Sequence, residues 1–251
     1  MSTSTASPAN RPADLRDQTV LVMGGSAGIG LATAIRARQE GADVILTARN
    51  GERLQAAARQ VDARTTAAFD AGDAAALGRF FDGLDAPLDQ VLVTAGGPHY
   101  GQLMELDADQ LQSAFSQRLV GVVEVARLAA GRMRPGGTLL FMGGTSGRRP
   151  ALGTGAASTV IVALPALIAN LALELAPIRI NLIAPGFVDT GLSATILGDQ
   201  LDARRDQLRA TLPIRRVVQA DDIARLAVHI MVNTALTGAT FDIDGGQQFV
   251  E

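Results

Sequence analysis

The sequence predicts a single-domain, doubly wound α/β protein of Rossmann type, with a parallel sheet of about seven strands flanked by helices. Apolar runs of strand length alternate with helical segments along the chain, and no linker-like change of composition separates them. Most of these runs are apolar throughout, as expected when helices cover both faces of a sheet. The first run, Val20–Met23, leads directly into a glycine-rich turn and then a helical segment, which is typical of a nucleotide-binding βαβ unit.

Composition limits the possible functions. The 251 residues suffice for one large domain, and the net charge of -3 gives no basic surface for nucleic acid. The chain has no cysteine, which excludes disulfides and thiol catalysis. We expect neither a metal site nor a nucleic-acid partner.

Two segments bear on targeting. Residues 1–14 are polar and rich in Ser, Thr, Pro and Ala, so we expect a disordered tail rather than a signal peptide, followed by one domain over residues 15–251. The most apolar window, Ala156–Ala176, contains Pro165, Asn170 and Glu174, which indicates a buried helix rather than a membrane span. We therefore expect a cytoplasmic protein without a membrane partner.

The elements follow in order. Strands are predicted at Val20–Met23, Asp43–Ala48, Thr65–Phe69, Gln90–Thr94, Thr138–Met142, Ile178–Ile183 and Ala239–Ile243. Helices are predicted at Leu31–Gly41, Gly51–Ala63, Asp73–Gly83, Asp107–Met133, Ala156–Ala176 and Asp221–Asn233. The run Arg134-Pro135-Gly136-Gly137 is expected to end the long fourth helix.

The turn Gly24–Gly30 is the first candidate binding element. Its glycines allow a sharp turn and a close approach of pyrophosphate, and the following helix offers unpaired N–H groups to that anion. A flexible loop is the alternative, but the turn lies where a strand should end, and the next apolar run follows after one helix length. Ligands of such sheets bind at the carboxyl ends of the strands, so the turns after the strands should line one cleft.

The end of the second strand indicates the cofactor. An NAD site usually has an acidic residue there, whereas Arg49 follows here and could bind the 2′-phosphate of NADP(H). A solvated surface arginine is the alternative. Asp70 follows the third strand and could accept a hydrogen bond from the adenine amino group, or else serve as a helix N-cap.

Over Leu15–Gly246 the chain resembles the short-chain dehydrogenase/reductase family. GGSAGIG resembles the family's TGxxxGxG loop, with Met23 in place of the usual Thr, and Ile178–Thr190 is similar to its IRVNxxxPGxxxT stretch. The resemblance implies NADP(H) as cofactor and a set of binding residues. These residues are Gly24, Ser26, Ala27, Gly28, Ile29, Gly30, Arg49, Asn50, Asp70, Ala71, Ala95, Gly96, Gly97, Pro185, Gly186, Val188 and Thr190.

The family's catalytic residues are a Ser, a Tyr-x-x-x-Lys pair and a helical Asn. Aligning the LALEL stretch, residues 171–175, with its family counterpart puts Ala157 at the Tyr position and Ile161 at the Lys position. The same register puts Gly144 at the Ser position and Arg118 at the Asn position. The chain contains no lysine at all, and its single tyrosine, Tyr100, lies far upstream. The resemblance therefore implies the fold and cofactor, but not the usual carbonyl–alcohol mechanism.

Three residues remain as candidate catalytic groups. His99 and Tyr100 follow the Ala95–Gly97 turn at the rim of the predicted cleft, and histidine can donate a proton near neutral pH. Tyr100 would need a cationic neighbour such as Arg118 to lower its pKa. The alternatives are loop packing for His99 and Tyr100, and a structural ion pair or interface contact for Arg118.

Three function classes follow from these residues. The first is an NADP(H)-dependent oxidoreductase whose small organic substrate is a bulky, apolar, C=N or quinone-like acceptor, because a pocket built from Gly144, Ala157 and Ile161 is apolar and roomier than usual. The second is an inactive NADP(H)-binding sensor or silent subunit, and the third, with no specific support, is a non-redox enzyme. Residues 191–218 resemble the family's mobile substrate lid, and the apolar Ala156–Ala176 helix suggests a homo-oligomer, a tetramer or dimer.

Overall fold

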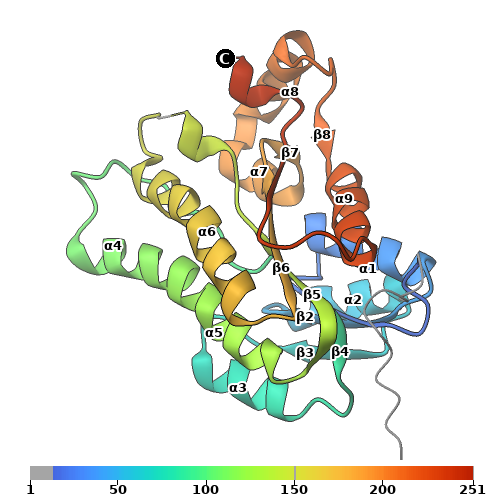
Figure 1. Cartoon of the computed structure of the whole chain (residues 1–251). Helices are drawn as coiled ribbons and strands as arrows, with labels where there is room; N and C mark the ends of the chain where they lie inside the picture. The colour runs from blue at the N-terminus through green and yellow to red at the C-terminus, as the bar shows by residue number, and fades with distance from the viewer. Residues whose placement is uncertain (1–13, 150, 251) are drawn as a thin grey trace, which may run out of the picture.

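The computed structural model describes residues 14–149 and 151–250, so the predicted tail lies outside the described residues except for Asp14. The prediction of an α/β fold with a seven-stranded parallel sheet is confirmed. The strand order is β3-β2-β1-β4-β5-β6-β9, and every neighbouring pair in it is parallel (Figure 1). A separate short pair, β7 and β8, is also parallel.

The strands form from the apolar runs of the sequence. They are β1 (Thr19–Met23), β2 (Asp43–Ala48), β3 (Thr65–Ala68), β4 (Leu88–Val93), β5 (Met133–Met142), β6 (Arg179–Pro185), β7 (Val188–Asp189), β8 (Val218–Gln219) and β9 (Thr240–Ile243). All five residues of β1 are buried, as expected for a central strand covered on both faces.

The helices lie between the strands. They are α1 (Gly28–Gln39), α2 (Gly51–Val61), α3 (Ala74–Asp82), α4 (Ala108–Phe115), α5 (Gly121–Ala130), α6 (Gly155–Glu174), α7 (Gly191–Leu197), α8 (Leu201–Thr211) and α9 (Ala220–Val232). Short helical turns are η2 (Ser116–Val120), η3 (Ser146–Arg148), η4 (Gly198–Gln200) and η5 (Gln247–Phe249).

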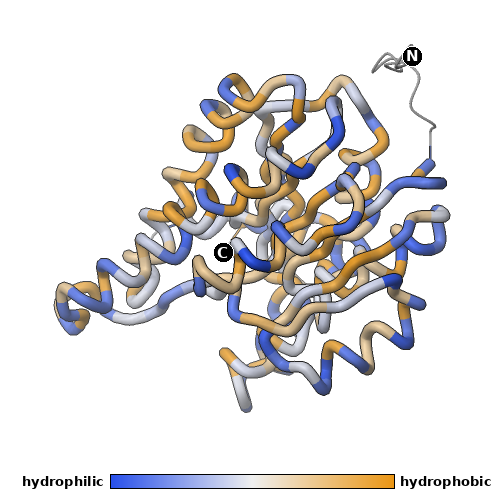
Figure 2. The backbone as a smooth tube through the Cα atoms, turned by 90° about the horizontal axis from the view of Figure 1, so that it is seen from below, coloured by the Kyte–Doolittle hydropathy of each residue, from blue (hydrophilic) through white to orange (hydrophobic). Residues whose placement is uncertain are grey.

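Two apolar cores cover the two faces of the sheet. One contains buried side chains of α1, α2 and α9, and the other contains those of α3, α5 and α6. Figure 2 shows the apolar segments running through the middle of the molecule, while α4 reaches outward from the sheet in both views (Figures 1 and 2). This three-layer arrangement leaves the carboxyl ends of the strands as the open end for a ligand.

The strand order reverses beside β1, because β2 and β3 lie on one side of it and β4 on the other. In open α/β sheets the ligand cleft forms at such a reversal. The glycine-rich turn after Met23 therefore sits at the point where the topology favours binding.

The predicted long helix Asp107–Met133 is wrong in two respects. It is interrupted by the π-helical turn η2 between α4 and α5, and it ends at Ala130. π-helical turns are rare and are frequent at functional sites. This one carries Arg118, which the sequence resemblance aligns with the family's Asn.

The run Arg134-Pro135-Gly136-Gly137 lies inside β5 and does not end a helix, contrary to the prediction. Met133 pairs with Leu88, whereas Thr138 pairs with Gln90, so the run forms an irregularity opposite a single residue of β4. Proline and glycine are tolerated in a sheet at such bulges. β5 therefore begins at Met133, ahead of the predicted Thr138–Met142, because Met133 pairs with β4. No local sequence pattern shows this pairing.

Among the described residues, one helix, α6, is long and apolar enough to cross a membrane by length and composition alone. One side of it packs on the sheet through buried residues such as Val160, Leu164 and Ile168. This side packs as in a core helix, whereas Val162 and Leu173 on the rest of α6 are exposed, so the prediction of a buried helix holds only for the side that faces the sheet.

Candidate functional site

The glycine-rich turn is fixed by the two strands on either side of β1. The N–H groups of Gly24 and Gly25 donate to the carbonyl of Thr47 in β2, at 2.8 and 3.1 Å. On the other side, the hydroxyl of Thr94 donates to the carbonyls of Met23 and Gly24, at 3.1 and 3.2 Å. The turn is therefore anchored to both neighbours and is not the flexible loop that the sequence left open.

Two of the predicted glycines are required by close approach. A Cβ atom on Gly24, whose φ is +92°, would lie 2.4 Å from the Thr94 hydroxyl oxygen. A Cβ on Gly30 would lie 2.3 Å from the carbonyl oxygen of Gly24. Only glycine fits at these positions, so the backbone turns as tightly as a pyrophosphate site needs.

Helix α1 begins at this turn with a free N-terminus. Its N-cap, Ala27, has no side-chain cap, and its first turn, which includes Gly28 and Ile29, carries no acidic residue. Its N–H groups and the helix dipole therefore remain available to an anion, and Ser26 precedes them with a hydroxyl. These features fit the diphosphate of a dinucleotide.

The residues predicted to contact the adenosine half follow β2 and β3. Arg49 and Asn50 are exposed, and the Asn50 side chain caps α2 by accepting from the N–H of Arg53 at 2.8 Å. Asp70 accepts from the N–H of Gly72 at 2.9 Å, while Asp73 provides the cap of α3. The N-cap alternative for Asp70 is therefore wrong, and its carboxylate stays exposed beside the partly buried Ala71.

The Pro185–Thr190 segment completes the cleft. The carbonyl of Pro185 accepts from the N–H of Thr145 at 3.0 Å, which ties the loop after β5 to the end of β6. Val188 is buried, and Thr190 caps α7. The side chain of Thr190 lies 3.6 Å from the ideal Cβ position of Gly28, so this segment reaches the glycine-rich turn. Gly186 directly follows Pro185, at the start of the stretch that runs from β6 to Thr190.

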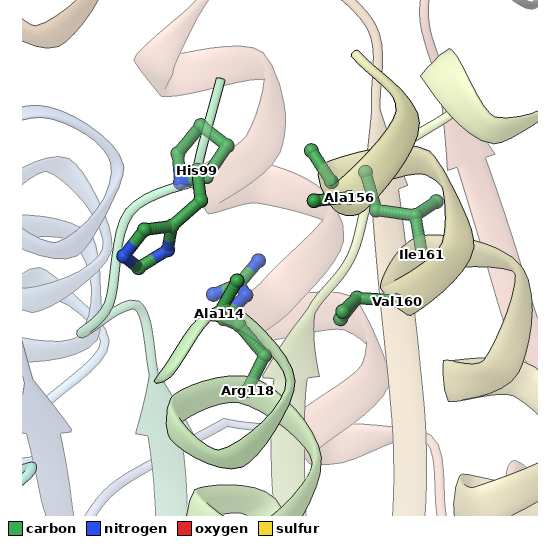
Figure 3. Close-up of a pocket in the computed structure, with 8 residues that line it drawn as sticks. His99, Ala114, Arg118, Ala156, Val160 and Ile161 are labelled. Atoms are coloured by element: carbon green, nitrogen blue, oxygen red, sulfur yellow. The ribbon is translucent and has the colours of Figure 1, made fainter. Parts of the chain in front are cut away.

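A pocket lies beside these loops and brings together two of the three candidate catalytic residues (Figure 3). Its lining is Pro98, His99, Ala114, Arg118, Ala156, Ala157, Val160 and Ile161. Figure 3 shows His99 and α6 on opposite sides of the pocket, with Arg118 reaching up from the η2 turn. The wall from α6 is entirely apolar.

Arg118 is held in this pocket without an acidic partner among the described residues, so the ion-pair alternative is wrong there. Its guanidinium donates to the carbonyl of Gly96 at 3.1 Å, at the turn that also holds Ala95 and Gly97. Burial lowers the pKa of Arg118. A partly desolvated cation is therefore available to a substrate that carries or develops negative charge.

Tyr100 lies near Arg118, as predicted, but its pKa moves in the opposite direction from the one expected. Burial raises the pKa of Tyr100, and the charge of Arg118 opposes this only in part. The phenol therefore stays protonated at neutral pH. It can donate a proton but cannot act as a base.

His99 has a ring nitrogen, Nδ1, that is buried and has no hydrogen-bond partner among the described residues. A buried polar atom without a partner costs free energy, and such atoms in folded proteins call for an explanation. A substrate or cofactor group in the pocket would give this nitrogen a partner.

The residues that the sequence resemblance aligns with the family's other catalytic positions lie near one another on the α6 side of the pocket. Ala157 and Ile161 belong to α6, and the Ile161 Cδ1 atom lies 3.3 Å from the ideal Cβ position of Gly144. The extra room expected beside Gly144 is therefore occupied by Ile161, which corrects the prediction of a roomier pocket. The prediction that the pocket is apolar on this side is confirmed by its lining.

Sequence reasoning gave no role to two residues that build the site. Thr94, the last residue of the predicted strand Gln90–Thr94, holds the glycine-rich turn through its hydroxyl. Gln247 lies far away in the chain, and its side-chain oxygen accepts from the N–H of Phe187 at 2.7 Å. Only the fold brings the C-terminal segment to the end of β6. Among the residues described by the structure, no group of three or more His, Asp or Glu side chains could hold a metal ion.

Comparison with known proteins agrees with this architecture. A family model described as enoyl-(acyl carrier protein) reductase matches residues 24–248. An uncharacterized oxidoreductase of Mycobacterium tuberculosis is 32% identical, with 94% of each chain covered. An NADP-dependent (R)-specific alcohol dehydrogenase of Lentilactobacillus kefiri is 28% identical, covering 92% of this chain and 97% of its own.

Among solved structures, BdcA in complex with NADPH is similar, with a TM-score of 0.82 and 30% identity over 94% of this chain and 96% of that one. The class of protein is defined by these matches together with the glycine-rich turn at the carboxyl end of β1 in a seven-stranded parallel sheet. The chain belongs to the short-chain dehydrogenase/reductase family of oxidoreductases.

Proposed function

We propose that this chain binds NADP(H) and transfers hydride between its nicotinamide and a small organic substrate. The anchored glycine-rich turn and the uncapped α1 support dinucleotide binding. Arg49 is exposed at the end of β2 and has no acidic partner among the described residues, so it is free to bind a 2′-phosphate. The NADPH complex of one structural neighbour and the NADP dependence of one relative support the same choice.

Titration with NADPH and NADH tests this choice, with binding followed by nicotinamide fluorescence. Arg49→Gln should weaken NADPH binding about tenfold, the loss of one charge-assisted interaction, and leave NADH binding unchanged. Arg53→Gln is the matched control, since it removes an exposed arginine in the next turn of the chain. Equal affinity of the unaltered protein for NADPH and NADH would contradict the proposal.

The active site is proposed to be non-standard. Gly144, Ala157 and Ile161 stand at the family's Ser, Tyr and Lys positions, and none of them can transfer a proton. Ala157 and Ile161 contribute to a pocket wall that is apolar, which favours an apolar acceptor. We therefore propose an acceptor that takes hydride without immediate protonation by the usual tyrosine, either a C=N or a quinone-like compound.

The charge of Arg118 distinguishes between the C=N acceptor and the quinone-like acceptor. NADPH supplies a hydride when bound. Addition to an iminium carbon moves the C=N π electrons to nitrogen and removes a positive charge, whereas addition to a quinone creates an oxyanion. A cation held in the pocket disfavours binding of the iminium and stabilises the oxyanion. Arg118 therefore makes the quinone-like acceptor the better proposal, with Tyr100 or solvent as proton donor to the hydroquinone anion.

The test is NADPH consumption with a panel of quinones, cyclic iminium ions and simple ketones. We expect quinones to be reduced fastest, and Arg118→Gln to lower their kcat/KM at least about tenfold while raising that of the iminium ions. Tyr100→Phe tests the proposed protein donor, and His99→Gln tests whether the imidazole donates instead. If the protein binds NADPH but consumes none with any acceptor, the second candidate is favoured, an inactive NADP(H)-binding sensor or silent subunit.

We also propose that the protein self-associates through η2, α5 and α6. Their outer sides form an apolar groove lined by Leu119, Val120, Val123, Ala163 and Leu167, in which Val120 is 55% exposed. Apolar surface of this kind favours a subunit contact. Sedimentation should give a dimer or tetramer that Val120→Asp dissociates, and a monomeric mass for the unaltered protein would rule this out.

A further inference from the structure

The pocket that His99 and Arg118 line is too small for a whole acceptor molecule. The volume open to the centre of a water molecule is about 10 Å³, which is room for roughly one water-sized group. A carbonyl oxygen at the edge of a quinone ring fits such a space, whereas the ring and its substituents do not. Most of the acceptor therefore has to lie on the surface that borders the pocket.

Two loops border the pocket from opposite sides (Figure 3). Residues 100–104 directly follow His99, which lines the pocket on one side. Residues 151–155 directly precede Ala156, which lines the pocket on the side of α6. Figure 1 shows the two loops together beside the start of α6, at the edge of the molecule. We call these two stretches together the rim of the pocket.

Direct contacts join the two loops of the rim. The N–H of Gly101 donates to the carbonyl of Gly153 at 2.8 Å. A Cβ atom on Gly155 would lie 2.5 Å from Cδ1 of Leu103, so the leucine side chain packs directly on the start of α6. The hydrogen bond and this packing make the rim one continuous surface beside the pocket.

The rim exposes apolar side chains and no charged ones. Met104 and Leu152 are 96% and 93% exposed, and Tyr100 and Leu103 are about half exposed. Neither loop of the rim contains an acidic or basic residue. Exposed apolar side chains that gather in one place are typical of a binding surface.

The polar side chains of Gln102 and Thr154 are bound within their own loops. The amide of Gln102 donates to the carboxylate of Glu105 at 3.0 Å, and the hydroxyl of Thr154 donates to the carbonyl of Ala151 at 2.8 Å. A group that lies on the rim is therefore stabilised mainly by the removal of apolar surface from water.

We propose that the rim binds an apolar chain of the acceptor while the reducible carbonyl of the acceptor enters the pocket toward Arg118. The quinone-like nature of the acceptor rests on the proposed function. The continuity of the rim with the pocket assigns the rim to the same molecule, because the pocket admits only the edge of the ring. The substrate class is thereby narrowed to quinone-like compounds that carry an apolar chain.

The experiment compares methyl-p-benzoquinone with decyl-p-benzoquinone, which share a reducible ring and differ in the length of the apolar chain. Binding is measured by calorimetric titration of the protein loaded with NADP⁺, which cannot reduce either compound. Burial of methylene groups on the rim should make the Kd of the decyl compound at least about tenfold lower than that of the methyl compound. NADPH consumption is followed in parallel with both quinones.

Met104→Gln and Leu152→Gln test the rim itself. Both side chains are almost fully exposed, so neither substitution disturbs the core. Each should reduce the ratio of the two Kd values at least about threefold, the effect of roughly one methylene group losing its contact. Leu173→Gln is the matched control, because it removes an 80% exposed leucine at the far end of α6 and should keep the ratio.

Equal Kd values for the two quinones in the unaltered protein would overturn the proposal, as would the same ratio in all three variants. A rim variant that lowers the sedimentation mass and leaves the ratio unchanged would show a subunit contact instead, which also overturns the proposal. No NADPH consumption with either quinone would count against the proposed function alone, because the Kd ratios still decide whether the rim binds an apolar chain.

Discussion

Substituting Gly30 by alanine is the sharpest test of the cofactor site. The new Cβ atom would lie 2.3 Å from the carbonyl oxygen of Gly24 and 2.8 Å from the hydroxyl oxygen of Thr94. Gly24 belongs to the turn proposed to hold the pyrophosphate, Thr94 anchors that turn, and neither atom is the flexible end of a long side chain. The overlap can be relieved only by moving the turn.

The cost follows from this geometry. Overpacking of a tight site costs about 1–3 kcal/mol, and here the displaced atoms form the binding surface itself. At about 1.4 kcal/mol per tenfold, this corresponds to about a 5- to 150-fold rise in the Kd for NADPH. Fluorescence titration measures the Kd, and a thermal scan of the same sample shows that the variant is folded.

Gly78→Ala is the matched control. Gly78 also lies in a helix, α3, but nothing lies within 4 Å of its ideal Cβ position. Alanine is favoured over glycine in a helix by about 1 kcal/mol, so the Tm should rise by about 2–4 °C with the Kd unchanged. If Gly30→Ala binds NADPH as tightly as this control, the assignment of the turn is refuted.

Three further predictions concern the scaffold. Arg179→Met removes the donor to four carbonyls at the end of α9, so at about 1 kcal/mol each the Tm should fall by about 8–16 °C in calorimetry. Arg216 lowers the pKa of Asp222, so this carboxylate stabilises the fold above the unfolded value of 3.8 and loses that effect as the pH falls. Asp222→Asn should accordingly lower the Tm at neutral pH, and the gap should close below about pH 4. Arg205→Gln should release α8 to faster proteolysis with the Kd for NADPH unchanged; protection equal to that of the unaltered protein would contradict the anchoring role.

The sheet could be predicted because its strands are continuous apolar runs separated by helices, a pattern that is local to each segment. The irregularities of the helices and strands could not be predicted in this way. The π-helical turn at Ser116–Val120 and the early start of β5 at Met133 depend on pairing with segments elsewhere, such as Leu88 in β4. Proline and glycine after Met133 signal a break, and only the sheet determines that the break is a bulge.

The site divides in the same way. The glycine-rich turn could be predicted, because its glycines act within one short segment. The pocket could not be predicted, because Ile161 of α6 fills the space beside Gly144 in the loop after β5. The direction of the Tyr100 pKa shift could not be predicted either, because it depends on burial in the fold.

Two arginines near the carboxyl ends of the strands keep their charge. Arg49 and Arg118 have no acidic partner among the described residues, whereas many other arginines, such as Arg38 and Arg64, are paired with aspartates. Uncompensated positive charge beside a binding cleft raises the local concentration of anions there. The 2′-phosphate of NADP(H) at Arg49 and an oxyanion that develops at Arg118 would neutralise these two cations. The cofactor and the quinone-like acceptor that we propose are therefore ligands whose negative charges these two positions can accommodate.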